Sequence, residues 1–152
     1  MSHETRIAVR TVAWSEALST GVAEIDAQHQ ELFRRVNRFL VAVGERRDLD
    51  ELQGLLDFLG RYVHEHFAEE LRMMKLSAYP GLGDHLAEHQ LFAREFHLRS
   101  AELQASGPTA ALARRLEHLL VDWLRDHVAG TDQAMGAWFA RFIGGRRAGP
   151  SA

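Results

Sequence analysis

The sequence of 152 residues predicts an all-α protein, an antiparallel up-down-up-down four-helix bundle with an N-terminal arm and a short C-terminal helix. Apolar residues recur at spacings of three and four through long segments, which is the period of an amphipathic helix. Proline is confined to positions 80, 108 and 150, and no segment reads as a strand. Four long helices with short connections favour a bundle.

The N-terminal half of the chain contains the arm and the first two predicted helices. Residues 1–19 read as an arm, with Trp14 as its anchor on the bundle. The first helix is predicted over 25–43, with Gly44 near its end. Its apolar stripe consists of Ile25, Leu32, Phe33, Val36, Phe39 and Leu40. The second helix is predicted over 49–76, with an apolar stripe of Leu52, Leu55, Leu56, Leu59, Val63, Phe67, Leu71 and Met74.

Breaks in the helical pattern place the remaining elements. "SAYPGLGD" ends the second helix, and Asp84 is the predicted N-cap of a third helix over 84–103. After the turn "ASGPT", a fourth helix is predicted over 110–128, and Gly130 interrupts the pattern before a short helix over 131–142. We expect the tail "GGRRAGPSA" (144–152) to be disordered. The chain therefore reads as one domain, 1–152, whose bundle and short helix occupy 20–143.

Composition excludes several classes of function. A net charge of −3 provides no basic field for nucleic acid. The absence of cysteine removes disulfides, thiolate metal sites and cysteine nucleophiles, and it fits a reducing compartment. No apolar run approaches the roughly 18 residues of a membrane span, and the N-terminus lacks the apolar region of a signal peptide. We expect a cytoplasmic monomer.

Two pairs of ionisable residues recur at helical spacing within the apolar stripes. Four residues advance a helix by roughly 400°, so residues i and i+4 lie nearly one above the other. His66 and Glu70 form such a pair on the second helix, and His85 and His89 form one on the third. This spacing suits two ligands of one metal ion.

Single histidines continue this inward pattern on the other two helices. His29 sits among the apolar residues of the first helix, and His127 follows Leu120, Trp123 and Leu124 on the fourth. Burying five imidazoles and a carboxylate without a shared partner would cost several kcal/mol. A metal centre removes that cost. The alternative interpretation is a metal-free structural bundle whose core histidines are hydrogen-bonded. The other four histidines are predicted to be surface or structural residues: His3, His64, His97 and His118. Glu65 and Glu69 are predicted to be solvated, or at most to contact the ligands from outside.

The inward residues occur in the order H…HxxxE…HxxxH…HxxxxD, carried by "GVAEIDAQHQELF", "HFAEELRM", "YPGLGDHLAEH" and "WLRDHVAGTD". From Trp14 to about Phe142 this pattern resembles the hemerythrins, of the bacterial single-domain kind. The resemblance implies a non-haem centre of two iron ions with an oxo or hydroxo bridge, and O₂ as its ligand. It implies that His85, His89 and His127 bind one iron, that His29 and His66 bind the other, and that Glu70 and Asp132 bridge them.

Asp132 does not fit this set by helical spacing alone. It lies five residues after His127, about 140° out of line on an ideal helix. Gly130 is where the helix could bend or open to correct the direction. The alternative is that Asp132 only caps the last short helix.

The predicted ligands also suit reversible binding of O₂ by iron. Imidazole and carboxylate fit iron, and the chain lacks the Glu-x-x-His motifs of the carboxylate-rich ferritin-like sites. Fewer anionic ligands stabilise the ferric state less, which favours reversible uptake of O₂. The resemblance implies that an apolar pocket for O₂ is lined by Leu32, Phe67, Trp123, Leu124 and Val128. Helical spacing independently places Leu32 beside His29, and Trp123 and Leu124 one turn before His127.

The sequence therefore predicts a di-iron protein that binds O₂ reversibly, for carriage, storage or delivery, and that is not an enzyme. One rival is an oxygen or redox sensor that acts through a separate, unidentified protein partner. Other rivals are peroxide or nitric oxide handling and iron sequestration, but no general acid or base beyond the ligands is evident.

Overall fold

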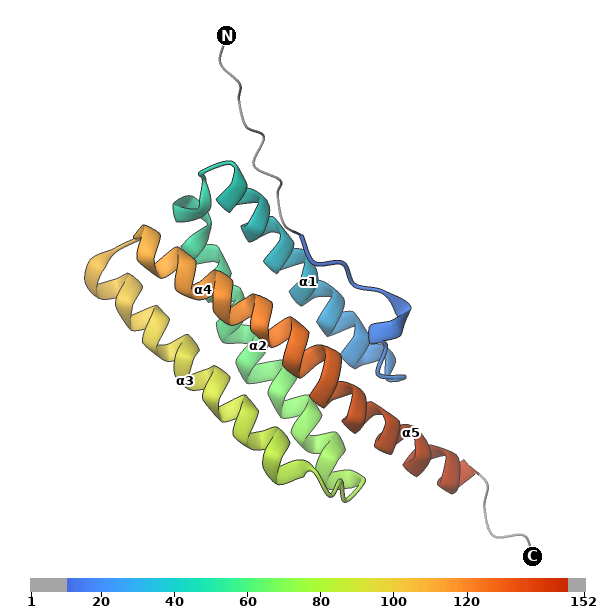
Figure 1. Cartoon of the computed structure of the whole chain (residues 1–152). Coiled ribbons are helices and arrows are strands. Elements are labelled where there is room, and N and C mark those ends of the chain that lie inside the picture. Colours follow the sequence, from blue (N-terminus) through green and yellow to red (C-terminus); the bar gives the residue numbers. More distant parts are fainter. Residues whose placement is uncertain (1–10, 148–152) are drawn as a thin grey trace, which may run out of the picture.

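The computed structural model describes residues 11–147, which form a four-helix bundle (Figure 1). Its helices are α1 (Ala23–Gly44), α2 (Asp48–Leu76), α3 (Leu82–Ser106) and α4 (Ala110–Asp122). Consecutive helices pack as antiparallel neighbours, and α4 closes the bundle against α1. The predicted fold class is confirmed. Among the described residues, no helix combines the length and hydropathy needed to cross a membrane.

The inward faces of these helices form one apolar core, which is why segments with the 3.6-residue period are helical here. On α2 the buried face differs in part from the predicted stripe. Phe58, Tyr62 and Met73 are buried, whereas Val63 and Leu71 are only partly buried. The buried face is therefore rotated toward the tyrosine and away from these two aliphatic residues.

The start of α3 corrects a further prediction. The helix begins at Leu82, and the residue at its cap position is Gly81. Asp84 therefore lies in the first turn, where its carboxylate interacts favourably with the helix dipole, and it is not the N-cap. The end of α3 is marked by Gly107, whose φ of 70° favours glycine.

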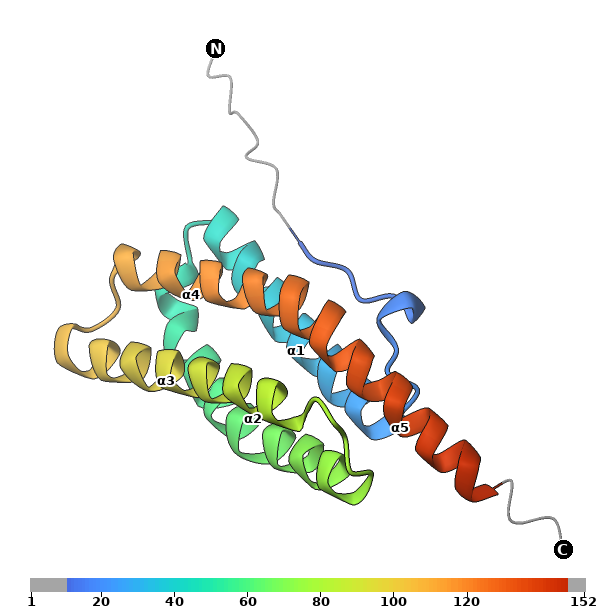
Figure 2. The ribbon, with the colours of Figure 1, turned by 60° about the horizontal axis from the view of Figure 1, so that its bottom comes forward.

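The fourth predicted helix and the short C-terminal helix form one continuous rod. The chain passes from α4 through the π-helical segment η2 (Trp123–Thr131) into α5 (Asp132–Arg147). The predicted interruption at Gly130 is wrong, because this residue lies inside η2. The far end of α5 extends beyond the bundle (Figure 2). Residues 144–147 of the predicted disordered tail are helical, and 148–152 lie outside the described residues.

The described part of the arm packs beside α1. The N–H of Val12 donates to Oδ1 of Asn37, and Nδ2 of Asn37 donates to the carbonyl of Val12, both at 2.7 Å. Trp14 packs partly buried against the core, as predicted for an anchor. Residues 1–10, which include His3, lie outside the described residues.

A glycine on α5 allows Thr20, which follows the arm, to pass close to the rod. A Cβ atom added at Gly136 would lie 2.4 Å from the carbonyl oxygen of Thr20. A larger residue at this position would push the arm away, so the absence of a side chain sets the path of the chain just before α1.

Candidate metal centre

The seven predicted metal ligands meet inside the bundle. They come from all four sides of it: His29 on α1, His66 and Glu70 on α2, His85 and His89 on α3, His127 on η2, and Asp132 at the start of α5. Each exposes 3 % or less of its surface. The structure therefore brings together every residue of the predicted set.

The two oxygens of Glu70 face different histidines. Oε1 lies 2.8 Å from Nε2 of His66 and 3.6 Å from Nε2 of His29. Oε2 lies 2.8 Å from Nε2 of His85 and 3.0 Å from Nε2 of His89. The carboxylate thus lies between a pair of histidines on one side and a second group on the other.

Asp132 divides the histidines in the same way. Oδ2 lies 2.9 Å from Nε2 of His29, whereas Oδ1 lies 3.1 Å from Nε2 of His127 and 3.2 Å from Nε2 of His85. The two carboxylates therefore separate a two-histidine group from a three-histidine group. In each group the potential ligand atoms lie within 4.8 Å of one another, and both carboxylates belong to both groups.

Several of these ligand atoms make no hydrogen bond although they are buried and close together. They include Nε2 of His29, His66 and His127, and both oxygens of Asp132. A buried polar group without a partner costs about 1–3 kcal/mol. Cations held between the two carboxylates would give these lone pairs partners, so the donor set fits a pair of metal ions.

The π-helical segment explains how Asp132 joins the cluster. On an α-helix a residue five positions after His127 points elsewhere, but a π-helix has hydrogen bonds from i to i+5, which place such residues on neighbouring turns. His127 lies in η2, and Asp132 follows it directly. The correction in direction anticipated near Gly130 is therefore made by a wider helical turn, without a break in the rod.

Charge within the cluster shifts the pKa values of its members. Burial lowers the pKa of His29 and His85, but the adjacent carboxylates of Asp132 and Glu70 outweigh it and raise both to about 9. Burial also raises the pKa of Glu70 and Asp132, yet the surrounding histidines hold both well below the ordinary range. Burial lowers the pKa of His89. Without a metal, the cluster therefore holds protons that a cation must displace.

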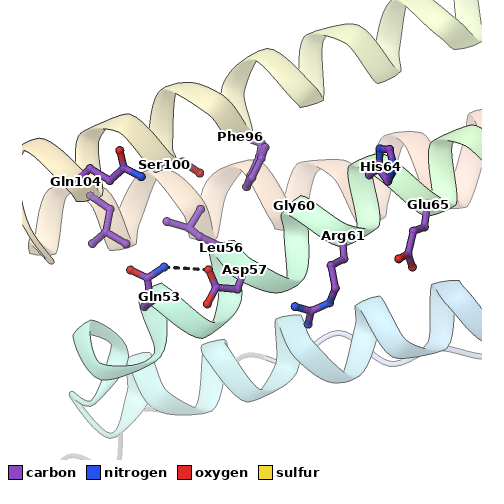
Figure 3. Close-up of a pocket in the computed structure, with 11 residues that line it drawn as sticks. Gln53, Leu56, Asp57, Gly60, Arg61, His64, Glu65, Phe96, Ser100 and Gln104 are labelled. Carbon is purple, nitrogen blue, oxygen red and sulfur yellow. Dashed lines mark hydrogen bonds between the residues drawn. The ribbon is translucent and has the colours of Figure 1, made fainter.

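The residues predicted to face outward lie away from the cluster. His64, His97 and His118 are exposed, as predicted. His64 and Glu65 line a surface groove of about 420 Å³ between α2 and α3, together with Phe96 (Figure 3). None of the seven clustered residues lines this groove.

A family model described as the hemerythrin HHE cation binding domain matches residues 20–139 of this chain. The chain belongs to the hemerythrin family. Hemerythrins hold a di-iron centre and bind O₂, and the buried histidine and carboxylate cluster of this hemerythrin fits that role.

Curated relatives agree with the family match. A bacteriohemerythrin from Ralstonia nicotianae is 33% identical over 133 residues, covering 86% of this chain and 90% of that protein. A bacteriohemerythrin from Stenotrophomonas maltophilia is 28% identical, covering 81% of this chain and 78% of that protein. A myohemerythrin from Riftia pachyptila is 28% identical, covering 78% of this chain and 86% of that protein. The similarity thus spans most of each molecule.

The five residues predicted to line the O₂ pocket of this hemerythrin are all buried in one apolar cluster: Leu32, Phe67, Trp123, Leu124 and Val128. Two of them stack on imidazoles of the three-histidine group. Trp123 stacks on His127 at a centroid distance of 3.7 Å, and Phe67 stacks on His89 at 3.8 Å. These rings shield that side of the cluster.

Sequence reasoning missed two residues on the two-histidine side. The ring of Tyr62 stacks on His66 at 4.5 Å, and its hydroxyl accepts a hydrogen bond of 3.5 Å from Nε1 of Trp123. Oε1 of Gln28 lies 2.5 Å from Nδ1 of His66 and orients that ring. Tyr62 could have been found by its i,i+4 spacing to His66, whereas Gln28 belongs to another helix and carries no such signal.

Proposed function

We propose that this chain binds O₂ reversibly at a pair of iron ions, for carriage, storage or delivery. His85, His89 and His127 would hold one iron, and His29 and His66 would hold the other. Glu70 and Asp132 would contribute to both sites. This assignment follows the two groups into which the carboxylate oxygens divide the histidines.

The observation that carries the proposal is the division of both carboxylates between the same two groups. Each carboxylate directs one oxygen toward the two-histidine group and the other toward the three-histidine group. A single metal site has no use for two carboxylates shared in this manner, whereas a pair of ions needs them as bridges. Because the two-histidine group offers one protein ligand fewer, O₂ would bind on this side of the cluster.

The surrounding residues keep that position dry. Leu32 is fully buried, and the ring of Tyr62 stacks on His66 of the two-histidine group. Trp123 and Phe67 cover His127 and His89 of the three-histidine group. Iron supplies the electrons for reversible binding, and the apolar wall excludes the water that would compete with O₂. Burial and the nearby carboxylates raise the pKa of Tyr62 well above its ordinary value, so its hydroxyl remains protonated beside His66.

The protein acts as a binding protein rather than an enzyme. Apart from the seven clustered residues, Tyr62 and Trp123, the buried side chains with polar groups in the described part of the chain are Thr20 and Ser77. Thr20 donates to Asp26 and Ser77 donates to the carbonyl of Met73, so both are engaged in local structure. Neither is placed as a general acid or base. A cytoplasmic monomer remains our expectation.

An oxygen or redox sensor is the second candidate, and one feature favours it. Asp132 is both a clustered carboxylate and the first residue of α5, whose far end extends beyond the bundle. A change in the metal centre would act directly on this helix and could be transmitted to a protein partner.

Metal analysis and visible spectroscopy test the proposal together. Protein expressed with iron should contain two irons per chain, and the reduced protein should develop an absorption band in air that disappears when O₂ is removed. One zinc ion, or no metal in folded protein, would exclude a di-iron centre. Two irons with an irreversible spectral change would instead favour the sensor or the peroxide and nitric oxide alternatives.

A further inference from the structure

We propose that Glu88 on α3 is a positioning residue that holds His127 and Asp132 in place, and that Thr131 fixes the carboxylate of Glu88 for this task. The inference rests on the proposed function, since the residues that Glu88 positions are proposed iron ligands.

The proposal starts from two contacts of one carboxylate. Oγ1 of Thr131 donates a hydrogen bond of 3.0 Å to Oε1 of Glu88. The other oxygen, Oε2, lies 3.7 Å from Nδ1 of His127. Glu88 therefore reaches across from α3 to both ends of the short stretch that separates His127 from Asp132.

The contact with His127 favours one of the two ring nitrogens of this residue as the one that binds a cation. Its Nε2 faces Asp132 inside the cluster, so the proton of the neutral ring has to sit on Nδ1 when Nε2 acts as a ligand. Nδ1 is buried and has no hydrogen-bond partner among the described residues. A carboxylate on that side favours the Nδ1–H tautomer and the ring orientation that metal binding requires.

The hydrogen bond with Thr131 holds the π-helical segment. Thr131 is the last residue of η2 and directly precedes Asp132. A π-helix is rarer than an α-helix and occurs mostly as single wide turns at functional sites. A hydrogen bond from Thr131 to a different helix opposes relaxation of that turn, and relaxation would rotate Asp132 away from the cluster.

Because the side chain of Glu88 is partly exposed, its positioning role can be tested without disturbing the packing of the core. Its side chain is 39% exposed and lines a groove of about 230 Å³ together with Trp123, His127 and Glu95. Removing a partly exposed carboxylate leaves the apolar core intact, so the metal-free bundle should tolerate the change. Glu95 provides a matched control, because it lies two turns further along the same helix, lines the same groove and is exposed.

The experiment compares Glu88→Ala, Glu88→Gln and Thr131→Val with Glu95→Ala. The measurements are the rate at which the reduced, iron-loaded protein loses iron to a ferrous chelator, the visible spectrum of the oxidised protein, and the melting temperature of the metal-free protein. Glu88→Ala should lose iron about 10–100-fold faster than the wild type, which is the usual effect of removing an outer partner of a ligand. Glu88→Gln and Thr131→Val should lie in between, and Glu95→Ala should match the wild type.

Two further readouts separate positioning from general stability. The Glu88→Ala spectrum should shift while the metal-free melting temperature stays unchanged, and Glu88→Gln should partly restore iron retention. Adding Thr131→Val to Glu88→Ala should have no further effect, because Thr131 acts through Glu88. The inference about Glu88 would be overturned if Glu88→Ala retained iron like the wild type. It would also be overturned if the metal-free melting temperature fell and Glu88→Gln did not restore iron retention. Neither result would affect the proposed function. A wild-type protein without two irons would overturn the proposed function as well.

Discussion

Nε2 of His127 and Oδ1 of Asp132 lie 3.1 Å apart, although the two residues are five positions apart in the chain. An α-helix cannot bring two such residues into contact on one face, whereas the π-helical turn over Trp123–Thr131 does so. This contact places the second shared carboxylate opposite Glu70 and completes both groups of ligand atoms.

Asp132→Ala should therefore damage both halves of the centre. The substitution removes an oxygen from each group, so we expect at most one iron per chain and no absorption band of an oxygenated form. The control is Asp126→Ala, which removes an exposed carboxylate of the same segment that pairs with Arg125. Elemental analysis and spectra of both variants provide the test, and two irons with a wild-type spectrum in Asp132→Ala would contradict the assignment.

The helical phase of α2 is tested by neighbouring residues of the same type. His66→Ala and Glu70→Ala should abolish the di-iron spectrum or leave one iron, because both side chains are buried in the cluster. His64→Ala and Glu69→Ala should retain both irons, because His64 is exposed and Glu69 pairs with Arg72 at the surface. The reverse result would mean that the other face of α2 binds the metal.

Metal loading should release protons at neutral pH. His29 and His85 have pKa values raised to about 9 in the metal-free protein, so both are protonated at pH 7 and must become neutral to bind a cation. We expect about two protons released per chain at pH 7 and progressively fewer as the pH rises through 9. Calorimetry of iron(II) binding in anaerobic buffers of different ionisation enthalpy measures this number, and binding without proton release would contradict it.

The stability of the metal-free protein should fall at alkaline pH. A histidine whose pKa is raised from 6.5 to about 9 on folding stabilises the fold fully below pH 6.5, and this contribution is lost as the pH rises through 9. Glu70 and Asp132 have lowered pKa values, so their contribution is present above the ordinary carboxyl range and is lost in acid. The metal-free melting temperature should thus decline from pH 7 to pH 9.

The stabilisation that iron adds should increase with pH, whereas the stability of the metal-free protein decreases. Protons compete less with the metal as the pH rises, so the gap in melting temperature between the loaded and metal-free forms should widen over the same interval. Thermal scans of both forms at matched pH provide the measurement. A gap that narrows toward pH 9, or equal melting temperatures throughout, would show that the metal does not replace protons in the cluster.

The apolar wall is tested by Trp123→Ala and Leu32→Ala. Both variants should form the oxygenated species, but it should decay faster to the ferric state, more so for Trp123→Ala, because water gains access to the iron. Loss of a core aromatic ring also costs about 3–5 kcal/mol of unfolding free energy. Trp138→Ala is the control, because Trp138 donates to the carbonyl of Ser77 and belongs to no part of the cluster. The measurement is the lifetime of the absorption band of the oxygenated form. Wild-type lifetimes in both variants, with two irons bound, would mean that O₂ does not bind beside Trp123 and Leu32.

The periodicity of the sequence was sufficient to predict much of this molecule. Apolar spacing placed four helices, and the i,i+4 pairs His66–Glu70 and His85–His89 marked the inward faces of two of them. Such relationships are local, because the geometry of an α-helix alone determines which side chains share a face. The exposure of His64, which is two residues from the buried His66, follows from the same geometry.

Only the tertiary structure decided the direction of Asp132 and the partners of the clustered histidines. The spacing of His127 and Asp132 predicted that the helix bends or opens near Gly130, and the structure shows that it opens into a π-helix over Trp123–Thr131. The contacts of Gln28 with His66 and of Glu88 with His127 join different helices. Sequence spacing reports the geometry within one helix, whereas the packing of neighbouring helices determines which side chains meet across the bundle.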